Sequence, residues 1–341
     1  MAVPVLLGLL GDHVVSAEEE TFDLFAQDLP SRDLGFVDPK APVLELTVAG
    51  RDLTIHQSPG LLSSDRAGGT TGAVVWAITP LFAAWLASPS NPLFTSRVLS
   101  PSAAVLELGC GISALVGLVV GPRVAQYVLT DQPYVARLVG QNMAANRQRP
   151  RQHHPSRRPT LRFAPLDWEA DEVTPALAGP DDDDAAAAVA RGSFDAAAVA
   201  RGSFDAVVAC DCVYNDALVE PLVAACRDVC SLRRRRRRDD GRRAASAAAG
   251  PCVCVVAQQL RDPEVFELWL ACFMRSFRVW RVPDALLPEG LRAGSGFVVH
   301  VGVLLEEAGG AADQVVMGAP LLPGYFLHFF VLAGAVPWEK H

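Results

Sequence analysis

The sequence has almost no lysine. Of its 30 basic residues only Lys40 and Lys340 are lysines, and both lie outside the expected core. Nicotinamide dehydrogenases that act through a Tyr-Lys pair are therefore excluded. An excess of positive charge is also missing, because 38 acidic residues bring the formal net charge to −8. This balance argues against a broad, non-specific nucleic-acid surface, so we expect no DNA partner.

Metal-ligand motifs are missing as well. The eight cysteines include no C-x-x-C pair, and the seven histidines do not stand at ligand spacing, so no metal site is expected. Two C-x-C pairs, Cys210/Cys212 and Cys252/Cys254, stand in apolar runs typical of buried strands, where alternate side chains point the same way. We interpret them as small buried hydrophobes with reduced, intracellular thiols.

No uninterrupted apolar run reaches the roughly 20 residues that a membrane-spanning helix needs. The apolar run near the amino terminus has no positive residue before it, which disfavours a secretory signal. Residues 315–336 carry no charged residue other than His328, but glycines and prolines interrupt them at five positions. We expect no membrane segment, and residues 307–341 are an appended tail of unclear role.

The chain is organised around residues 105–116, VLELGCGISALV. Four strand-like residues run into Gly109, Cys110 and Gly111, and an apolar, helix-like run follows. In a parallel α/β sheet, such a glycine turn lies at the carboxyl edge of a strand, where a ligand can approach the backbone. With half of the 341 residues hydrophobic, the chain can bury a substantial core.

Two carboxylates near the glycine turn indicate which kind of ligand it binds. Glu107 lies two residues before the first glycine, and Asp131 ends the next expected strand, 22 residues after Gly109. An acidic side chain at that second spacing reaches a ribose hydroxyl. A carboxylate as close as Glu107 repels a pyrophosphate but suits an ammonium group, so the pair favours S-adenosylmethionine over a dinucleotide. The alternative is that Glu107 merely closes a strand at the surface.

Residues 1–70 are predicted to form an amino-terminal extension, with a helix at 18–25 and a hairpin around Gly50. Residues 72–86 resemble an apolar helix that Pro80 should kink. Trp76 in this run is either plain core or a wall of the cofactor site.

The segment from 71 to 306 is predicted to be one catalytic domain. Its strands are expected at 105–108, 126–130, 161–165, 206–211, 253–257, 277–282 and 297–304, and its later helices at 133–146, 218–229 and 263–274. No helix is expected between the last two strands, so a largely parallel sheet ends in a hairpin. Trp168, at the exit of the third strand, either stacks on an adenine or belongs to a surface turn.

Two insertions interrupt this domain. The first, near 169–203, contains most of an identical tandem repeat, AAAVARGSFD, at 186–195 and 196–205. Only the second copy leads into a strand, so the first is interpreted as a loop duplication. The second insertion, near 231–250, contains six consecutive arginines, Arg233, Arg234, Arg235, Arg236, Arg237 and Arg238. They form either a solvated, disordered loop or a weak contact for RNA or an acidic partner.

Several motifs together resemble a known family. VLELGCG, LTDQ, LDW, ACDCVYN, QQLRDPEVFELWL and GSGFVVHVG are similar to segments of the seven-stranded protein-lysine methyltransferases, and in particular of the fungal ribosomal lysine N-methyltransferase 5 group. The resemblance spans residues 9–304. Its most specific motif is D-x-x-Y, here Asp211 to Tyr214. Ser113 departs from the glycine that many relatives have there.

The resemblance implies an α/β fold, a Rossmann-like class I methyltransferase sheet with its last strand antiparallel. It also implies that Asp211 orients the amine of a substrate lysine and that Tyr214 shapes the pocket. The cofactor S-adenosylmethionine would contact Trp76, Gly109, Cys110, Gly111, Asp131, Trp168 and Cys210, the last through its backbone. The expected reaction is monomethylation of a lysine on a 60S large-subunit ribosomal protein, in the cytoplasm or the nucleus.

Two alternatives come from other classes. An adenine or glutamine N-methyltransferase would carry an Asn/Asp-Pro-Pro-Tyr turn after the fourth strand, whereas this chain has Asp-Cys-Val-Tyr there. A non-catalytic ribosome-binding module, or a methyltransferase acting on another protein lysine, remains open, because the duplicated loop and the tail suggest relaxed constraint.

Overall fold

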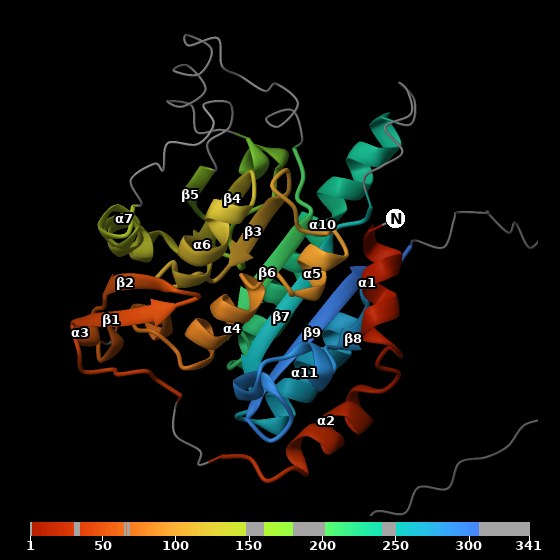
Figure 1. Cartoon of the computed structure of the whole chain (residues 1–341), viewed down its shortest axis with the longest axis horizontal. Helices are drawn as coiled ribbons and strands as arrows, with labels where there is room; N and C mark the ends of the chain where they lie inside the picture. Colours follow the sequence, from red (N-terminus) through yellow and green to blue (C-terminus); the bar gives the residue numbers. More distant parts are fainter. Residues whose placement is uncertain are drawn as a thin grey trace, which may run out of the picture. The chain divides into compact units, whose positions relative to one another are not determined.

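The computed structural model of the chain describes residues 2–30, 35–64, 66, 69–147, 160–179, 202–240 and 250–306, without the side chains of 235–240. Figure 1 shows these residues in colour.

A seven-stranded sheet forms the centre of the fold. Its strands lie in the order β5-β4-β3-β6-β7-β9-β8. All neighbours pair in parallel except β9, which is antiparallel to both β7 and β8. The strands are β3 (Ala104–Leu108), β4 (Gln126–Asp131), β5 (Thr160–Pro165), β6 (Ala206–Cys210), β7 (Val253–Gln259), β8 (Phe277–Arg281) and β9 (Phe297–Leu304). A separate hairpin consists of β1 (Val43–Val48) and β2 (Arg51–His56). The predicted sheet with a terminal hairpin is confirmed.

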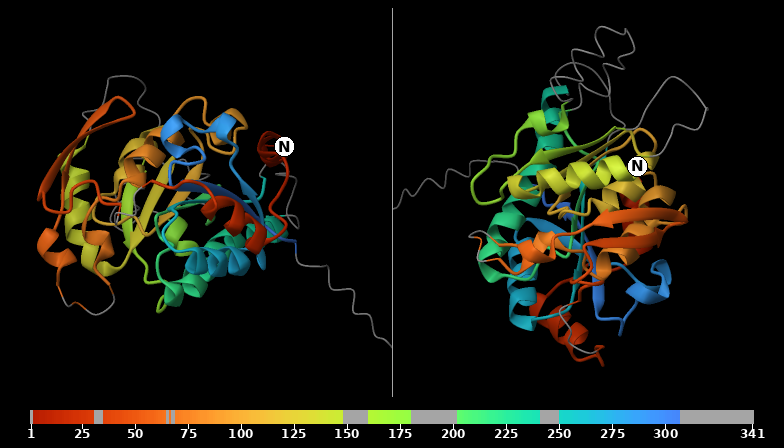
Figure 2. Two further views of the ribbon diagram at one scale, coloured as in Figure 1. Left: turned by 90° about the horizontal axis from the view of Figure 1, so that it is seen from below. Right: turned by 90° about the vertical axis from the view of Figure 1, so that its left-hand side faces the viewer.

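Helices cover both faces of the sheet (Figure 2). They are α1 (Ala2–Leu10), α2 (Ala17–Phe25), α3 (Pro59–Leu62), α4 (Ile78–Leu86), α5 (Pro92–Thr95), α6 (Leu115–Val120), α7 (Ala136–Ala145), α10 (Val219–Asp240) and α11 (Pro263–Met274). Short 3₁₀ turns occupy Asp284–Leu286 and Glu289–Leu291, between β8 and β9. In agreement with the sequence, no α-helix separates these two strands.

Alternation along the central strands divides the apolar residues between two cores. In β6, Val208 contributes to one core, with α1, α4, α6 and the hairpin, whereas its neighbour Val207 contributes to the other, with α10 and α11. Such strands read as continuous hydrophobic runs, because both of their faces are buried.

The strand order creates a switch point at β3. The chain continues from β3 to β4 on one side, whereas β6 pairs with the other edge of β3. In open α/β sheets, ligands bind beyond the carboxyl ends of the strands at such a point. The glycine turn after β3 occupies this position.

The amino-terminal residues pack on the sheet. Leu6 of α1 and Ile55 of β2 are fully buried in the core that also contains α4. On α2, a carboxylate oxygen of Glu20 lies 3.0 Å from Nε2 of His300 in β9 and 3.5 Å from Nε of Arg281. These contacts hold α1, α2 and the hairpin against the sheet, and the division into an extension and a domain remains a prediction.

The prediction of one kinked helix over 72–86 is wrong. A short 3₁₀ turn covers Thr71–Ala73, Trp76 forms an isolated bridge with Phe36, and α4 begins only at Ile78. Pro80 consequently lies in the first turn of α4, where no backbone N–H needs an intrahelical acceptor, so it causes no kink.

The expectation of a disordered arginine loop is also wrong, because α10 continues through the arginine run to Asp240. Arg233 is buried and lies 2.7 Å from Asp205, and Arg234 donates to the carbonyls of Leu304 and Leu305. These two arginines therefore stabilise the fold, and a contact of the whole run with RNA is not supported by their positions.

The placement of the fourth strand on the second repeat copy is confirmed, since β6 begins at Ala206. The first copy, at 186–195, and the tail, 307–341, lie outside the described residues. In the part of the chain that the structure describes, no helix is long and apolar enough to cross a membrane.

Candidate active site

The glycine turn has a backbone that suits glycine alone. Gly109 and Gly111 have φ values of +67° and +57°. A Cβ on Gly109 would lie 2.6 Å from Sγ of Cys212 and 3.1 Å from the ring of Trp168. The turn is therefore packed too closely against the next loops to accept a side chain.

The turn opens on a cavity of about 900 Å³, including its mouth. The cavity lies at the carboxyl ends of β3, β4, β5 and β6, and the segment before α4 also contributes to it. Every residue predicted for the site lines it: Trp76, Glu107, Gly109, Cys110, Gly111, Asp131, Trp168, Cys210, Asp211 and Tyr214. The structure therefore brings all the predicted site residues together around one cavity, and their individual roles stay predictions.

Asp131 ties the end of β4 to the glycine turn. Its carboxylate accepts hydrogen bonds from the backbone N–H of Gly111 (2.9 Å) and of Gln132 (2.7 Å). Burial nevertheless raises the pKa of Asp131 to about 6. The side chain remains an acceptor at the rim of the turn, where a ribose hydroxyl could donate to it.

Glu107 is almost fully buried on β3 and faces the cavity. The hydroxyl of Tyr127 donates to its carboxylate at 2.8 Å. Burial raises the pKa of Glu107 to about 8, so the group is largely protonated at neutral pH. Its selectivity against phosphate therefore depends less on a fixed charge than the sequence suggested. The alternative, that Glu107 closes a strand at the surface, is wrong.

Trp168 offers an aromatic wall across from the glycine turn. Its side chain is half-buried, and its ring packs against Gly109. The indole Nε1 is buried and has no hydrogen-bond partner among the described residues. A buried donor of this kind usually finds an acceptor, so a polar ligand in the cavity would satisfy it.

Three buried thiols border the cavity, those of Cys110, Cys210 and Cys212, and burial raises the pKa of each. They are not activated nucleophiles, because that role needs a lowered pKa. Cys210 and Cys212 pack in opposite cores, so the expectation that both point the same way is wrong. In the described ranges, no group of three or more His, Cys, Asp or Glu side chains is placed to hold a metal ion.

The backbone conformation of Asp211 explains why the side chains of Cys210 and Cys212 enter opposite cores. Asp211 follows β6 with a φ of +60°, in the left-handed region that non-glycine residues rarely adopt. Strain at such a position is maintained by surrounding contacts and is frequent at functional sites. Here the carboxylate forms a bidentate ion pair with Arg261, at 2.6 and 2.7 Å.

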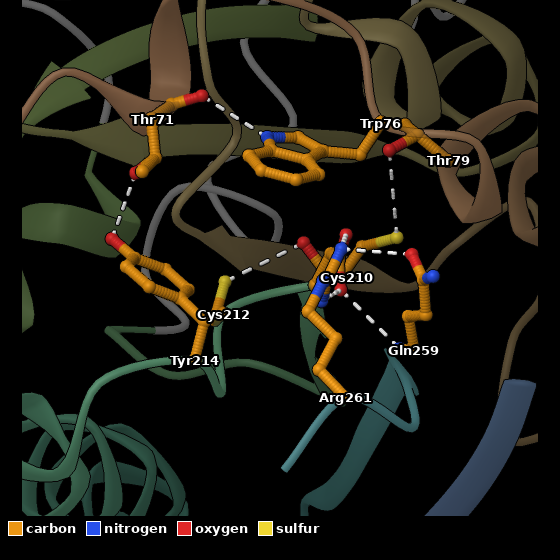
Figure 3. Close-up of polar contacts among 9 residues, drawn as sticks. Thr71, Trp76, Thr79, Cys210, Cys212, Tyr214, Gln259 and Arg261 are labelled. Carbon is orange, nitrogen blue, oxygen red and sulfur yellow. Dashed lines mark hydrogen bonds and ion pairs between the residues drawn. The ribbon is translucent and has the colours of Figure 1, made fainter. Parts of the chain in front are cut away.

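The other end of the D-x-x-Y element is joined to the segment before α4. The hydroxyl of Thr71 donates to that of Tyr214 at 2.9 Å, and the indole N–H of Trp76 donates to the carbonyl of Thr71 at 3.0 Å. Figure 3 shows Tyr214, Thr71 and Trp76 arranged in this sequence around the opening. Tyr214 is partly exposed, so it stands at the mouth.

Arg261 and Thr71 are the main features of the site that sequence reasoning missed. Arg261 follows β7, the strand next to β6, and parallel strands end at the same edge of a sheet. An arginine two residues past the end of β7 was therefore the available signal. Thr71 offered no signal, because its role depends on the three-dimensional position of Tyr214.

The cavity presents donor, acceptor and aromatic groups that suit S-adenosylmethionine. The close packing at Gly109 leaves room for backbone contact only, Asp131 and Glu107 present acceptors, and Nε1 of Trp168 is an unused donor. A nucleoside joined to an amino acid needs acceptors for its hydroxyls and ammonium and an aromatic surface for its base. The described residues supply all three.

The sheet order, the single antiparallel strand β9 and the glycine turn at the switch point define the fold of the class I methyltransferases. Comparison with protein families adds that residues 55–181 match the model described as lysine methyltransferase. Over these residues the chain is similar to this lysine methyltransferase family. The matched residues include the glycine turn, Asp131 and Trp168 but end before Asp211.

Individual relatives agree with the family. Ribosomal lysine N-methyltransferase 5 of Zygosaccharomyces rouxii is 34% identical over 50% of this chain and 58% of its own length. The protein of the same name from Eremothecium gossypii is 29% identical over 51% of this chain and 60% of its own length. The chain thus spans less than two thirds of these two relatives.

A third relative has a different name. Diaminohydroxyphosphoribosylamino-pyrimidine deaminase of Schizosaccharomyces pombe is 34% identical over 39% of this chain, but the match covers only 32% of that protein. A C-x-x-C pair belongs to the zinc-deaminase signature, and this chain has none. We therefore do not infer deaminase chemistry for this chain from that relative.

Solved structures with a similar arrangement include a 23S rRNA methyltransferase, ErmE, with 13% identity, a TM-score of 0.31 and coverage of 62% of this chain and 67% of that one. The YcgJ protein of Bacillus subtilis has 11% identity, a TM-score of 0.35 and coverage of 64% and 99%.

Proposed function

We propose that the chain is a protein-lysine N-methyltransferase that uses S-adenosylmethionine. The observation that carries the proposal is the meeting, in one cavity, of the glycine turn and both ends of the D-x-x-Y element. The cofactor would lie along the glycine turn, Asp131 and Trp168, and the acceptor amine would approach from the side of Asp211 and Tyr214. The lysine methyltransferase family match supports the choice of acceptor.

When bound, S-adenosylmethionine supplies an activated methyl group on a sulfonium. The residues of the chain then have a task of positioning, because the reaction needs an aligned, neutral amine and a dry site. Oδ2 of Asp211 retains a lone pair beyond its bond to Arg261, and there it accepts a hydrogen bond from the amine. Tyr214, held by Thr71, and Trp76 narrow the mouth so that an extended lysine side chain fits.

The proposed substrate is a lysine of a 60S large-subunit ribosomal protein, which receives one methyl group in the cytoplasm. The names of the relatives from Zygosaccharomyces rouxii and Eremothecium gossypii support this substrate. A substrate in the ribosome would also bring the enzyme close to RNA, but Arg233 and Arg234 already have partners within the chain.

The substrate is tested with large ribosomal subunits from Zygosaccharomyces rouxii cells that lack the relative's gene, so that the target lysine is unmethylated. The protein is incubated with these subunits and labelled S-adenosylmethionine, and the labelled protein is analysed by mass spectrometry. A single added methyl group on one lysine is expected. Label on RNA, or on an amino acid other than lysine, would refute the proposed acceptor.

Trp168→Ala should weaken cofactor binding by about 1 to 3 kcal/mol, the range for an aromatic side chain stacked on a base. Trp168→Phe retains a ring, so most of the affinity should remain. Calorimetry with S-adenosylmethionine measures both variants. An affinity of the alanine variant equal to that of the wild type would place Trp168 outside the binding site.

Cofactor affinity should rise with pH between 6.5 and 7.5, by up to about tenfold. The pKa of Glu107 is raised to about 8 in the free protein. Since a cationic ligand favours the ionised carboxyl, binding releases a proton, and a rising pH makes that release easier. The dissociation constant is measured across this range for the wild type and for Glu107→Gln. A slope that persists in Glu107→Gln would assign the proton to another group.

A further inference from the structure

The ion pair between Asp211 and Arg261 is the feature of the site that the proposed chemistry leaves unexplained. The side chain of Asp211 is 1% exposed and that of Arg261 is 19% exposed. The two N–H groups of the guanidinium lie 2.6 and 2.7 Å from the two carboxylate oxygens. A bidentate pair of this kind fixes the plane of the carboxylate as well as its charge.

The side chain of Arg261 contacts three other residues at once. Besides Asp211, it donates to Oε1 of Gln259 at 2.9 Å, and its guanidinium carbon lies 4.7 Å from the centre of the Trp76 ring. Figure 3 shows the guanidinium beneath the indole, on the side away from Tyr214. Asp211 and Trp76 line the cavity, whereas Arg261 stands behind them. The guanidinium is thus fixed just outside the space where the acceptor must lie.

We infer that Arg261 is a positioning residue for methyl transfer, which neutralises Asp211 so that the carboxylate aligns the incoming lysine amine without holding it as an ammonium ion. The inference rests on the proposed function. It assigns the arginine after β7 to the acceptor side of the site.

The physical reason is that a carboxylate binds the ammonium form of lysine best, whereas only the neutral amine reacts. A free lysine has a pKa of about 10.4, and the reaction needs its neutral form. An unpaired carboxylate beside the amine would stabilise the ammonium and raise that pKa by about 1 to 3 units. Because Arg261 cancels the charge of Asp211, the carboxylate keeps its hydrogen-bonding geometry but loses most of its preference for a cation.

The other titratable groups around Asp211 do not replace this effect. Burial raises the pKa values of Cys210, Cys212 and Tyr214, so these groups are uncharged at neutral pH. Glu107 and Asp131, on β3 and β4, titrate within the working range, with pKa values of about 8 and 6. Both remain in every variant below, so comparison with the wild-type pH profile isolates the contribution of Arg261.

The experiment measures the single-turnover rate of methyl transfer against pH at saturating S-adenosylmethionine. The substrate is the unmethylated large ribosomal subunits of Zygosaccharomyces rouxii. In Arg261→Gln, the acid limb of the profile should move to higher pH by about 1 to 3 units, because the unpaired Asp211 retains the ammonium. The rate at pH 7.5 should fall at least about tenfold and recover toward pH 9.5, while cofactor affinity stays within about twofold of the wild type.

Two further variants separate charge from shape. Arg261→Lys keeps the charge but loses the bidentate geometry, so its rate should fall while its profile stays at the wild-type position. Asp211→Asn removes the negative charge that balances Arg261 beside the amine, so its residual rate should show an acid limb moved to lower pH. If Arg261→Gln does not fold, the pH profile of Asp211→Asn still tests the inference. Arg275→Gln is the matched control, because this arginine pairs with Glu220 at the surface.

Several outcomes would overturn the inference. A uniform fall in rate with an unmoved profile in Arg261→Gln would give Arg261 a purely structural role, as would equal shifts in Arg261→Gln and Arg261→Lys. If Arg261→Gln does not fold, an unmoved profile in Asp211→Asn would have the same meaning. A wild-type protein that transfers no methyl group would refute the proposed function itself, and the inference would fall with it.

Discussion

Asp211→Ala should reduce methyl transfer at least about 100-fold while S-adenosylmethionine still binds. The carboxylate ends β6 beside the point where the methyl group is presented, and loss of its hydrogen bond removes the alignment of the amine. The substitution also leaves Arg261 without its bidentate partner and places alanine at a φ of +60°, so a lower melting temperature is expected. Turnover with labelled cofactor is measured beside cofactor affinity.

Asp211→Asn is the cleaner variant, because asparagine tolerates the left-handed conformation better than alanine does. Its rate should be intermediate if orientation dominates and close to that of Asp211→Ala if the charge is essential. Asp228→Asn, which removes an exposed acid on α10, serves as the control. Wild-type turnover by Asp211→Ala would mean that the D-x-x-Y element is structural in this protein.

Gly109→Ala should weaken cofactor binding at least about 30-fold and also lower the melting temperature. The φ of +67° costs an alanine about 1 to 2 kcal/mol, and the added Cβ would meet Sγ of Cys212 at 2.6 Å and the ring of Trp168 at 3.1 Å. Displacement of Trp168 then removes part of the stacking surface. Calorimetry and the melting temperature are both expected to report the change.

Gly140→Ala is the matched control for that substitution. Gly140 lies within α7, has no positive φ, and a Cβ there would have no neighbour within 4 Å. Alanine is also the better helix former, so this variant should bind normally and be slightly more stable. Normal cofactor binding by Gly109→Ala as well would show that the turn does not shape the ligand site.

The glycine turn and the strands could be predicted because their signals are local. Gly109 and Gly111 have positive φ values, a conformation that glycine itself indicates. Asp131 reaches the turn because its distance along the chain is set by one connection and one strand. The apolar runs of the central strands likewise reflect burial on both faces. Such features need no knowledge of distant partners.

The remaining features depend on contacts between residues far apart in the chain. Thr71 is joined to Tyr214, and Arg261 to Asp211 and Trp76, only after the sheet brings them together. The apolar pattern of residues 72–86 suggested a single helix, but the bridge between Phe36 and Trp76 holds the first part extended.

The arginine run illustrates the opposite error. Its composition suggested a solvated loop, yet arginine is a good helix former, and partners for the first two side chains lie on neighbouring strands and loops. Arg233 pairs with Asp205, just before β6, and Arg234 reaches Leu304 at the end of β9. The composition of the run alone could not predict these partners.

The assignment of the cavity to S-adenosylmethionine is tested most directly by calorimetry of the purified protein with two ligands, S-adenosylmethionine and NAD. Both contain an adenosine, but only one has a sulfonium and an ammonium, and only the other has a pyrophosphate. With Glu107 and Asp131 facing the cavity, saturable binding of S-adenosylmethionine and none of NAD is expected. Binding of NAD with no binding of S-adenosylmethionine would contradict the assignment and, with it, the proposed methyl transfer.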